Sequence, residues 1–150
     1  MPPGDDPFEL GRFLEAQQSC FLQVCAELRA GVKRTHWMWF IFPQLKGLGF
    51  SATAQRYGIS GLAEACAYLA HPVLGGRLLT CTELTTALSP RPVESVFGYP
   101  DHLKFHSSMT LFARAAGSKD GPFRSALARY FAGAEDAATV RLLRPTDAAS

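Results

Sequence analysis

The stretch of residues 33–44 combines aromatic and polar side chains that suit ligand binding. It holds both tryptophans of the chain, with an arginine, a histidine and a glutamine around them (Arg34, His36, Trp37, Trp39, Gln44). Flat rings stack on planar ligands, while Arg and Gln donate directed hydrogen bonds. A histidine in a loop is also a usable acid, base or donor. We therefore expect this aromatic strip (residues 33–44) to line a pocket, although aromatics at this density equally form a protein core.

A second group of polar residues begins a helix predicted from residue 101. Lys104, Ser107 and Ser108 are three and four residues apart and share one helix face, where an ammonium and two hydroxyls could hold a phosphate or carboxylate. The alternative is a solvated lysine with serines that bond their own helix backbone. His102 and His106 have a metal-ligand spacing, but no Glu or Cys accompanies them, so we predict no metal site.

Three residues are candidates for catalysis: His36, Glu64 and Asp101. Glu64 is the only carboxylate on its apolar helix, and it could act as a base, or else face solvent or pair with an arginine such as Arg56. Glu64 or Asp101 would stabilise a cationic, sugar-like transition state or activate water, with His36 as the donor. Gln17, a polar residue on an apolar stripe, needs a partner if it is buried. The common catalytic motifs are absent, so whether the protein is an enzyme stays open.

The composition bounds the class of protein. The chain has 150 residues, 47% hydrophobic and 19% charged, which fits one globular domain. The net charge of +2 is spread along the chain, which argues against a nucleic-acid binder. The N-terminus is acidic and Pro-rich without a signal sequence, and Trp37–Phe42 is too short to span a bilayer, so we expect a cytoplasmic protein without a membrane segment. Four cysteines without a C-x-x-C pair predict no zinc, disulfide or cofactor.

The elements that must position these residues are helical. Apolar residues recur three and four apart, and Gly, Pro and Asp residues interrupt the pattern. We predict an all-α, single compact domain of about six to seven helices with a long aromatic-rich loop after the first. The domain spans residues 8–144, between a flexible leader (1–7) and a flexible tail (145–150). The predicted helices are Phe8–Ala30, Ser60 (as N-cap) to Ala70, Pro72–Leu88, Val93–Phe97, one capped by Asp101 and ended by Gly117, a helix from Pro122 to Gly133 and one capped by Asp136 through Leu143, with helical turns at 35–40 and Ala52–Tyr57.

Four blocks of the sequence match a known family: residues 33–44, Ala54–Ile59, Glu64–Gly75, and Asp101–Lys104 with Ser107–Phe112. On these blocks the chain resembles the domain-of-unknown-function 1810 family, found mostly in bacteria and sometimes mislabelled "calpastatin", over about residues 6–143. The resemblance implies a mainly α-helical fold and names no activity or substrate. His102 and His106 lie outside the family pattern. The blocks point to the polar and aromatic residues already singled out (Arg34, His36, Trp37, Trp39, Gln44, Tyr57, Glu64, Lys104, Ser107, Ser108).

A fainter likeness is to helical N-glycosidases of ADP-ribose-type or riboflavin-precursor substrates, which also combine an aromatic strip, a Glu-bearing helix and a later Lys-bearing helix. The leading hypothesis is that a pocket between the aromatic strip and the Lys104 helix binds a small, flat, anionic ligand that is nucleotide or ADP-ribose-like. In one version of this hypothesis the protein also hydrolyses the ligand as an N-glycosidase. Trp37 or Trp39 would stack on the base, and the anion would be held by polar side chains (Arg34, Lys104, Ser107, Ser108). The alternative is a non-enzymatic interaction module with the strip as an exposed docking surface. The oligomeric state stays open.

Overall fold

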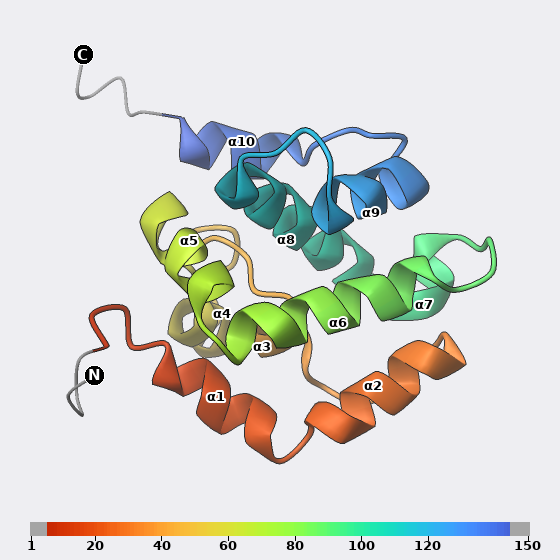
Figure 1. The fold of residues 1–150 in the computed structure, drawn as a ribbon, viewed down its shortest axis with the longest axis horizontal. Coiled ribbons are helices and arrows are strands. Elements are labelled where there is room, and N and C mark those ends of the chain that lie inside the picture. Colours follow the sequence, from red (N-terminus) through yellow and green to blue (C-terminus); the bar gives the residue numbers. More distant parts are fainter. Residues whose placement is uncertain (1–5, 145–150) are drawn as a thin grey trace.

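Ten α-helices and no strand make up residues 6–144, the part of the chain that the computed structural model describes. An isolated bridge joins Leu45 to Ile59. The all-α, single-domain prediction is confirmed, whereas the predicted number of six to seven helices is too low. Residues 1–5 and the predicted tail 145–150 lie outside the described residues. The helices in chain order (Figure 1) are α1 (Gly11–Gln18), α2 (Phe21–Ala30), α3 (Met38–Ile41), α4 (Ala52–Tyr57), α5 (Leu62–Ala70), α6 (Leu74–Thr86), α7 (Val93–Phe97), α8 (Asp101–Ala116), α9 (Pro122–Phe131) and α10 (Ala137–Leu143).

The predicted first helix is two helices. α1 ends at Gln18 and α2 starts at Phe21, with Cys20 in a non-helical conformation (φ −131°, ψ −5°) between them. The apolar stripe nevertheless continues, because Phe13 and Gln17 of α1 are buried, and so is Val24 of α2. The spacing of apolar residues indicates which side chains face the core, but it does not show whether they belong to one continuous helix. The two predicted turns also form the short helices α3 and α4, which accounts for the rest of the difference in number.

Local capping signals set several helix ends. Ser51 Oγ accepts from Ala54 N at 3.0 Å and starts α4, and Asp136 accepts from Thr139 N and starts α10 as predicted. The prediction of Ser60 as an N-cap is wrong: α5 begins at Leu62, and the amide and hydroxyl of Ser60 donate to the Glu64 carboxylate instead. The prediction of Asp101 as an N-cap is also wrong, because Asp101 is the first residue of α8 and its carboxylate pairs with Lys33 and Lys104. α6 begins two residues later than expected, after the His71 ring nitrogen has accepted from the amides of residues 73 and 74.

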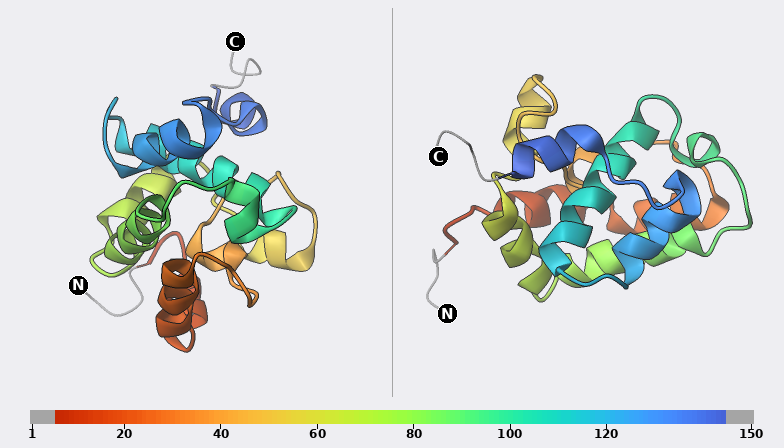
Figure 2. Two further views of the ribbon diagram at one scale, coloured as in Figure 1. Left: turned by 90° about the vertical axis from the view of Figure 1, so that its right-hand side faces the viewer. Right: turned by 90° about the horizontal axis from the view of Figure 1, so that it is seen from above.

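α8 is the central helix of the fold, and it contacts α3, α5, α7, α9 and α10. α1 and α2 lie on one side of the molecule and α9 and α10 on the opposite side (Figures 1 and 2). The largest side chains at 2% exposure or less form one aromatic-rich core (Phe13, Trp37, Phe42, Tyr68, Phe105, Phe112). The resulting interior surrounds α8 with aromatic rings and leaves its first turns at the surface, where Lys104 lies.

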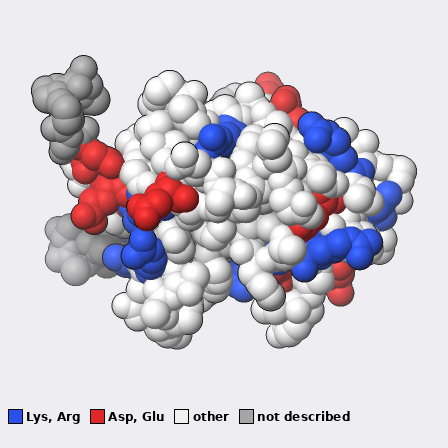
Figure 3. Space-filling model, turned by 90° about the horizontal axis from the view of Figure 1, so that it is seen from below, with Lys and Arg blue, Asp and Glu red and all other residues white. Residues whose placement is uncertain are grey.

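Charged side chains of both signs are interspersed on the face seen from α1 and α2, and much of that face is uncharged (Figure 3). None of the helices within residues 6–144 combines the length and apolar character needed to cross a bilayer.

Candidate functional site

A buried carboxylate on α2 fixes the start of the aromatic strip. Glu27 is 3% exposed. Its Oε1 accepts from the amides of Arg34 (2.7 Å) and Thr35 (3.1 Å) and from Trp37 Nε1 (2.9 Å), and its Oε2 accepts from Thr35 Oγ1 (2.6 Å) and Gln23 Nε2 (3.0 Å). Burial alone raises the pKa of Glu27, but the hydrogen bonds outweigh burial and lower the pKa from 4.5 to about 2. Sequence reasoning missed this residue, because its spacing does not distinguish it from a surface glutamate.

The two tryptophans of the strip occupy different environments. Trp37 is 2% exposed and packs against Phe42 and Phe97, so it belongs to the core. Trp39 is partly exposed and lies beside Gly49, where an added Cβ would be 3.3 Å from the indole ring. Two positions along the chain therefore separate a core tryptophan from one at the surface. The exposed side chains of the strip that precede them, Arg34 and His36, do not line the cavities described below.

A cavity of about 360 Å³, here called the Lys104 pocket, lies between the strip, the loop that follows it, α8 and α10. Ligand pockets in proteins span roughly 300–1,000 Å³, so this one suits a small molecule. The structure brings four of the predicted ligand-binding residues to it and adds one that was not predicted. The polar and aromatic side chains that line it are Trp39, Gln44, Lys104, Ser107 and Asp136.

Lys104 is the cation of this pocket. Its Nζ lies 4.4 Å from the centroid of the Trp39 ring and 2.9 Å from Asp101 Oδ1. The other oxygen of Asp101 is 2.8 Å from Lys33 Nζ, whose side chain is 8% exposed. Burial raises the pKa of Asp101, but hydrogen bonds and charge from Lys33 and Lys104 outweigh it and lower the pKa below its ordinary value. One carboxylate thus serves two ammonium groups, which leaves this trio with an excess positive charge.

Asp136 supplies a carboxylate on the other side of the pocket. Its Oδ2 accepts from Thr139 N (3.0 Å) and Thr139 Oγ1 (2.6 Å), as expected of a helix cap. Ser107 Oγ lies 3.2 Å from the same oxygen and 3.1 Å from the carbonyl of Leu103. Ser108, by contrast, is 0% exposed and does not line the pocket. The sequence signalled the capping role of Asp136 and gave no sign that the cap faces Lys104 and Trp39.

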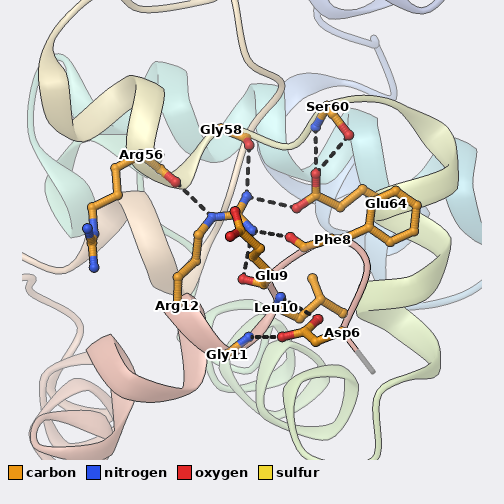
Figure 4. A network of polar contacts seen from close by, with 10 residues as sticks. All are labelled: Asp6, Phe8, Glu9, Leu10, Gly11, Arg12, Arg56, Gly58, Ser60 and Glu64. Carbon is orange, nitrogen blue, oxygen red and sulfur yellow. Dashed lines mark hydrogen bonds and ion pairs between the residues drawn. The ribbon is translucent and has the colours of Figure 1, made fainter. Parts of the chain in front are cut away.

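Glu64 lies elsewhere, beside a larger cavity of about 840 Å³ that Arg12 and Ser60 also line. Its Oε2 is 2.8 Å from Arg12 Nη2, and its Oε1 accepts from both the amide (2.9 Å) and the hydroxyl (2.8 Å) of Ser60. This network joins the N-terminal segment to the α4–α5 corner. Because Arg12 and Ser60 already occupy both oxygens of the Glu64 carboxylate, this carboxylate has little capacity left to bind a ligand. The other four donors of Arg12 bond backbone carbonyls (Figure 4: Phe8, Glu9, Arg56, Gly58).

Three further residues from the sequence predictions also lie outside the Lys104 pocket. Tyr57 packs between Phe13 and Phe40. His106 stacks on Phe131 at 3.9 Å between ring centroids, and His102 lies 3.9 Å from Glu94. Within residues 6–144 no three His, Cys, Asp or Glu side chains are grouped so that they could hold a metal ion.

Comparison with known proteins agrees with the resemblance seen in the sequence blocks. A family model described as "Protein of unknown function (DUF1810)" matches residues 7–143. No curated protein matches the chain. The chain is similar to the crystal structure of the conserved hypothetical protein Rv1873 from Mycobacterium tuberculosis, with 55% sequence identity and a TM-score of 0.90. The match covers 94% of this chain and 100% of that one, so the two share their fold throughout.

Proposed function

The chain belongs to the DUF1810 family of proteins of unknown function, and from its own geometry we propose that it binds a small, ring-bearing organic anion of the nucleotide or ADP-ribose type in the Lys104 pocket. The observation that carries this proposal is the position of the Lys104 ammonium, 4.4 Å above the Trp39 ring at the wall of a small cavity. An aromatic face and a cation at one point suit a ligand that is planar and negatively charged.

Each polar group of the pocket has a role in this proposal. The Lys104 ammonium moves from the Trp39 face to a phosphate or carboxylate of the ligand, and Asp101 keeps its bond to Lys33. The uncovered Trp39 ring then stacks on the ligand ring. Asp136, a carboxylate, accepts hydrogen bonds from sugar hydroxyls, and the Gln44 amide pairs with polar atoms of a base. A ligand with an anion, a ring and hydroxyl groups uses all of them, and nucleotides have this make-up.

The proposal does not extend to hydrolysis. None of the three candidate catalytic residues, His36, Glu64 and Asp101, lines the pocket, and Glu64 is engaged with Arg12 and Ser60. The third, Asp101, is bridged to two lysines, which favours a structural and electrostatic role. Binding is therefore the function that these contacts support best.

An interaction module built on the aromatic strip has less support from the geometry. Four of the apolar side chains in the strip are 2% exposed or less (Trp37, Met38, Ile41, Phe42), so they offer almost no surface to a partner.

Calorimetric titration with AMP, ADP-ribose and ribose 5-phosphate at constant ionic strength tests the proposal. We expect at least one of them to bind wild type, and Lys104→Gln to weaken that binding at least tenfold by removing a charge-assisted contact. Trp39→Leu should weaken AMP more than ribose 5-phosphate, which has no aromatic ring to stack. His36→Ala is the matched control outside the pocket and should bind like wild type. Equal affinities for wild type and Lys104→Gln, or no binding to either, would refute the proposed site.

A further inference from the structure

Part of the wall of the Lys104 pocket is apolar. Leu48, Pro100 and Leu103 line it, and Leu103 is nevertheless 47% exposed. Two of the most exposed large hydrophobic side chains, Phe50 (84%) and Tyr99 (80%), each follow or precede a lining residue in the sequence. Single exposed leucines are common on protein surfaces, but apolar side chains grouped along the wall of a cavity offer a surface on which an apolar part of a ligand can pack.

The cation and the apolar wall are adjacent on one helix. Leu103 and Lys104 are consecutive residues in the first turns of α8, and Ser107 follows one turn later on the same wall. Leu48 faces the cavity from the loop after the aromatic strip. A ligand whose charged group lies at Lys104 therefore has hydrocarbon beside it, where a purely polar ligand would leave Leu48 and Leu103 in contact with water.

We propose that the natural ligand is amphipathic: next to its anionic group it carries an acyl, alkyl or aryl substituent that lies on Leu48, Pro100 and Leu103. This inference rests on the proposed function and narrows its ligand class, since simple nucleotides and sugar phosphates then occupy only part of the site. Binding then removes from water the hydrocarbon of the ligand and that of the pocket wall. Each methylene group of the ligand that becomes buried should raise the affinity about fourfold.

Two probes with the same head group separate the two proposals: phenyl phosphate and 4-butylphenyl phosphate. Their affinities are measured by NMR titration of the ¹⁵N-labelled full chain. We expect phenyl phosphate to bind wild type and to lose affinity in Lys104→Gln. The butyl probe should bind wild type at least tenfold more tightly than phenyl phosphate, because several of its carbons are buried. In Leu103→Asn the butyl advantage, taken as the ratio of the two affinities measured in the same variant, should fall to about threefold or less.

Leu22→Asn is the matched control, because Leu22 is 85% exposed on α2 and does not line the pocket. It should keep the full butyl advantage. If phenyl phosphate does not bind, or binds independently of Lys104, the proposed function fails. If phenyl phosphate binds through Lys104 but the butyl group adds nothing, the proposed function stands and the amphipathic ligand is refuted. A butyl advantage that survives in Leu103→Asn, or that falls equally in Leu22→Asn, also refutes it, since the group then binds elsewhere.

Discussion

Replacing Glu27 by glutamine tests how much one buried carboxylate stabilises the start of the aromatic strip. The lowered pKa supplies the magnitude: a change from 4.5 in the unfolded chain to about 2 in the folded protein. Each pKa unit corresponds to about 1.4 kcal/mol, so ionised Glu27 contributes on the order of 3 kcal/mol to the free energy of unfolding at neutral pH. The glutamine side chain in Glu27→Gln would keep an acceptor for Trp37 but would direct its amide N–H groups at two other donors, Gln23 Nε2 and Thr35 Oγ1.

The sign of the pH dependence follows from the direction of this shift. Because the folded protein holds Glu27 ionised more strongly than the unfolded chain does, the stabilisation is complete above about pH 4.5 and is lost as the pH falls towards 2. Urea denaturation followed by circular dichroism, at pH 7, 5, 4 and 3, measures this. We expect Glu27→Gln to lower the free energy of unfolding by about 3 kcal/mol at pH 7, and the gap to wild type to narrow below pH 4.5.

Glu83→Gln is the control, because Glu83 is an exposed glutamate of α6 whose loss should change the free energy of unfolding by less than about 0.5 kcal/mol. The reasoning is refuted if Glu27→Gln stays within about 0.5 kcal/mol of wild type at pH 7. It is equally refuted if the difference between the two proteins stays constant from pH 7 to pH 3, since the carboxylate charge would then have no part in it.

Two further predictions concern the close packing of α5 against α6 and the Arg12–Glu64 ion pair. Gly75→Ala should destabilise the protein by about 1–3 kcal/mol in urea denaturation, because its Cβ would clash with the backbone carbonyl of Leu69 and force α5 and α6 apart. Gly76→Ala, one residue on in the same helix with nothing within 4 Å, should instead stabilise by about 0.5–1 kcal/mol; equal effects at both positions would contradict the clash. Arg12→Lys should lower the free energy of unfolding in urea denaturation by about 2 kcal/mol, because an ammonium cannot bond the four carbonyls and the Glu64 carboxylate together. A decrease below about 0.5 kcal/mol would show that the positive charge alone is enough at this position.

Local sequence signals predicted those parts of the fold that depend on a few neighbouring residues. The bounds of α4 and α7 agree with the prediction, Gly117 ends α8 in the left-handed conformation, and Asp136 caps α10. Each of these rests on a cap, a glycine or a proline acting within one turn of helix. The family was also recognisable from contiguous blocks, and the family model confirms it over residues 7–143.

The candidate site was predicted only in part. Lys104, Ser107, Trp39 and Gln44 line one cavity, and their role in binding a ligand stays a prediction. The side-chain chemistry of these residues was enough to suggest them. Only the tertiary structure shows that they lie together, because nothing in the residue spacing indicates that the start of α10 brings Asp136 to the same cavity.

The sequence by itself therefore determined the helical class, most helix ends, the family and the residue types available for binding, because caps, breakers and periodicity act over a few residues. Only the tertiary structure decided that Trp37 enters the core while Trp39 faces the pocket, that Glu64 pairs with Arg12, and that the first helix is broken. These outcomes depend on contacts between residues far apart in the chain. The Arg12–Glu64 pair shows the reason: the two residues are 52 positions apart, and only the packing of the N-terminal segment against the α4–α5 corner brings Arg12 Nη2 within 2.8 Å of Glu64 Oε2.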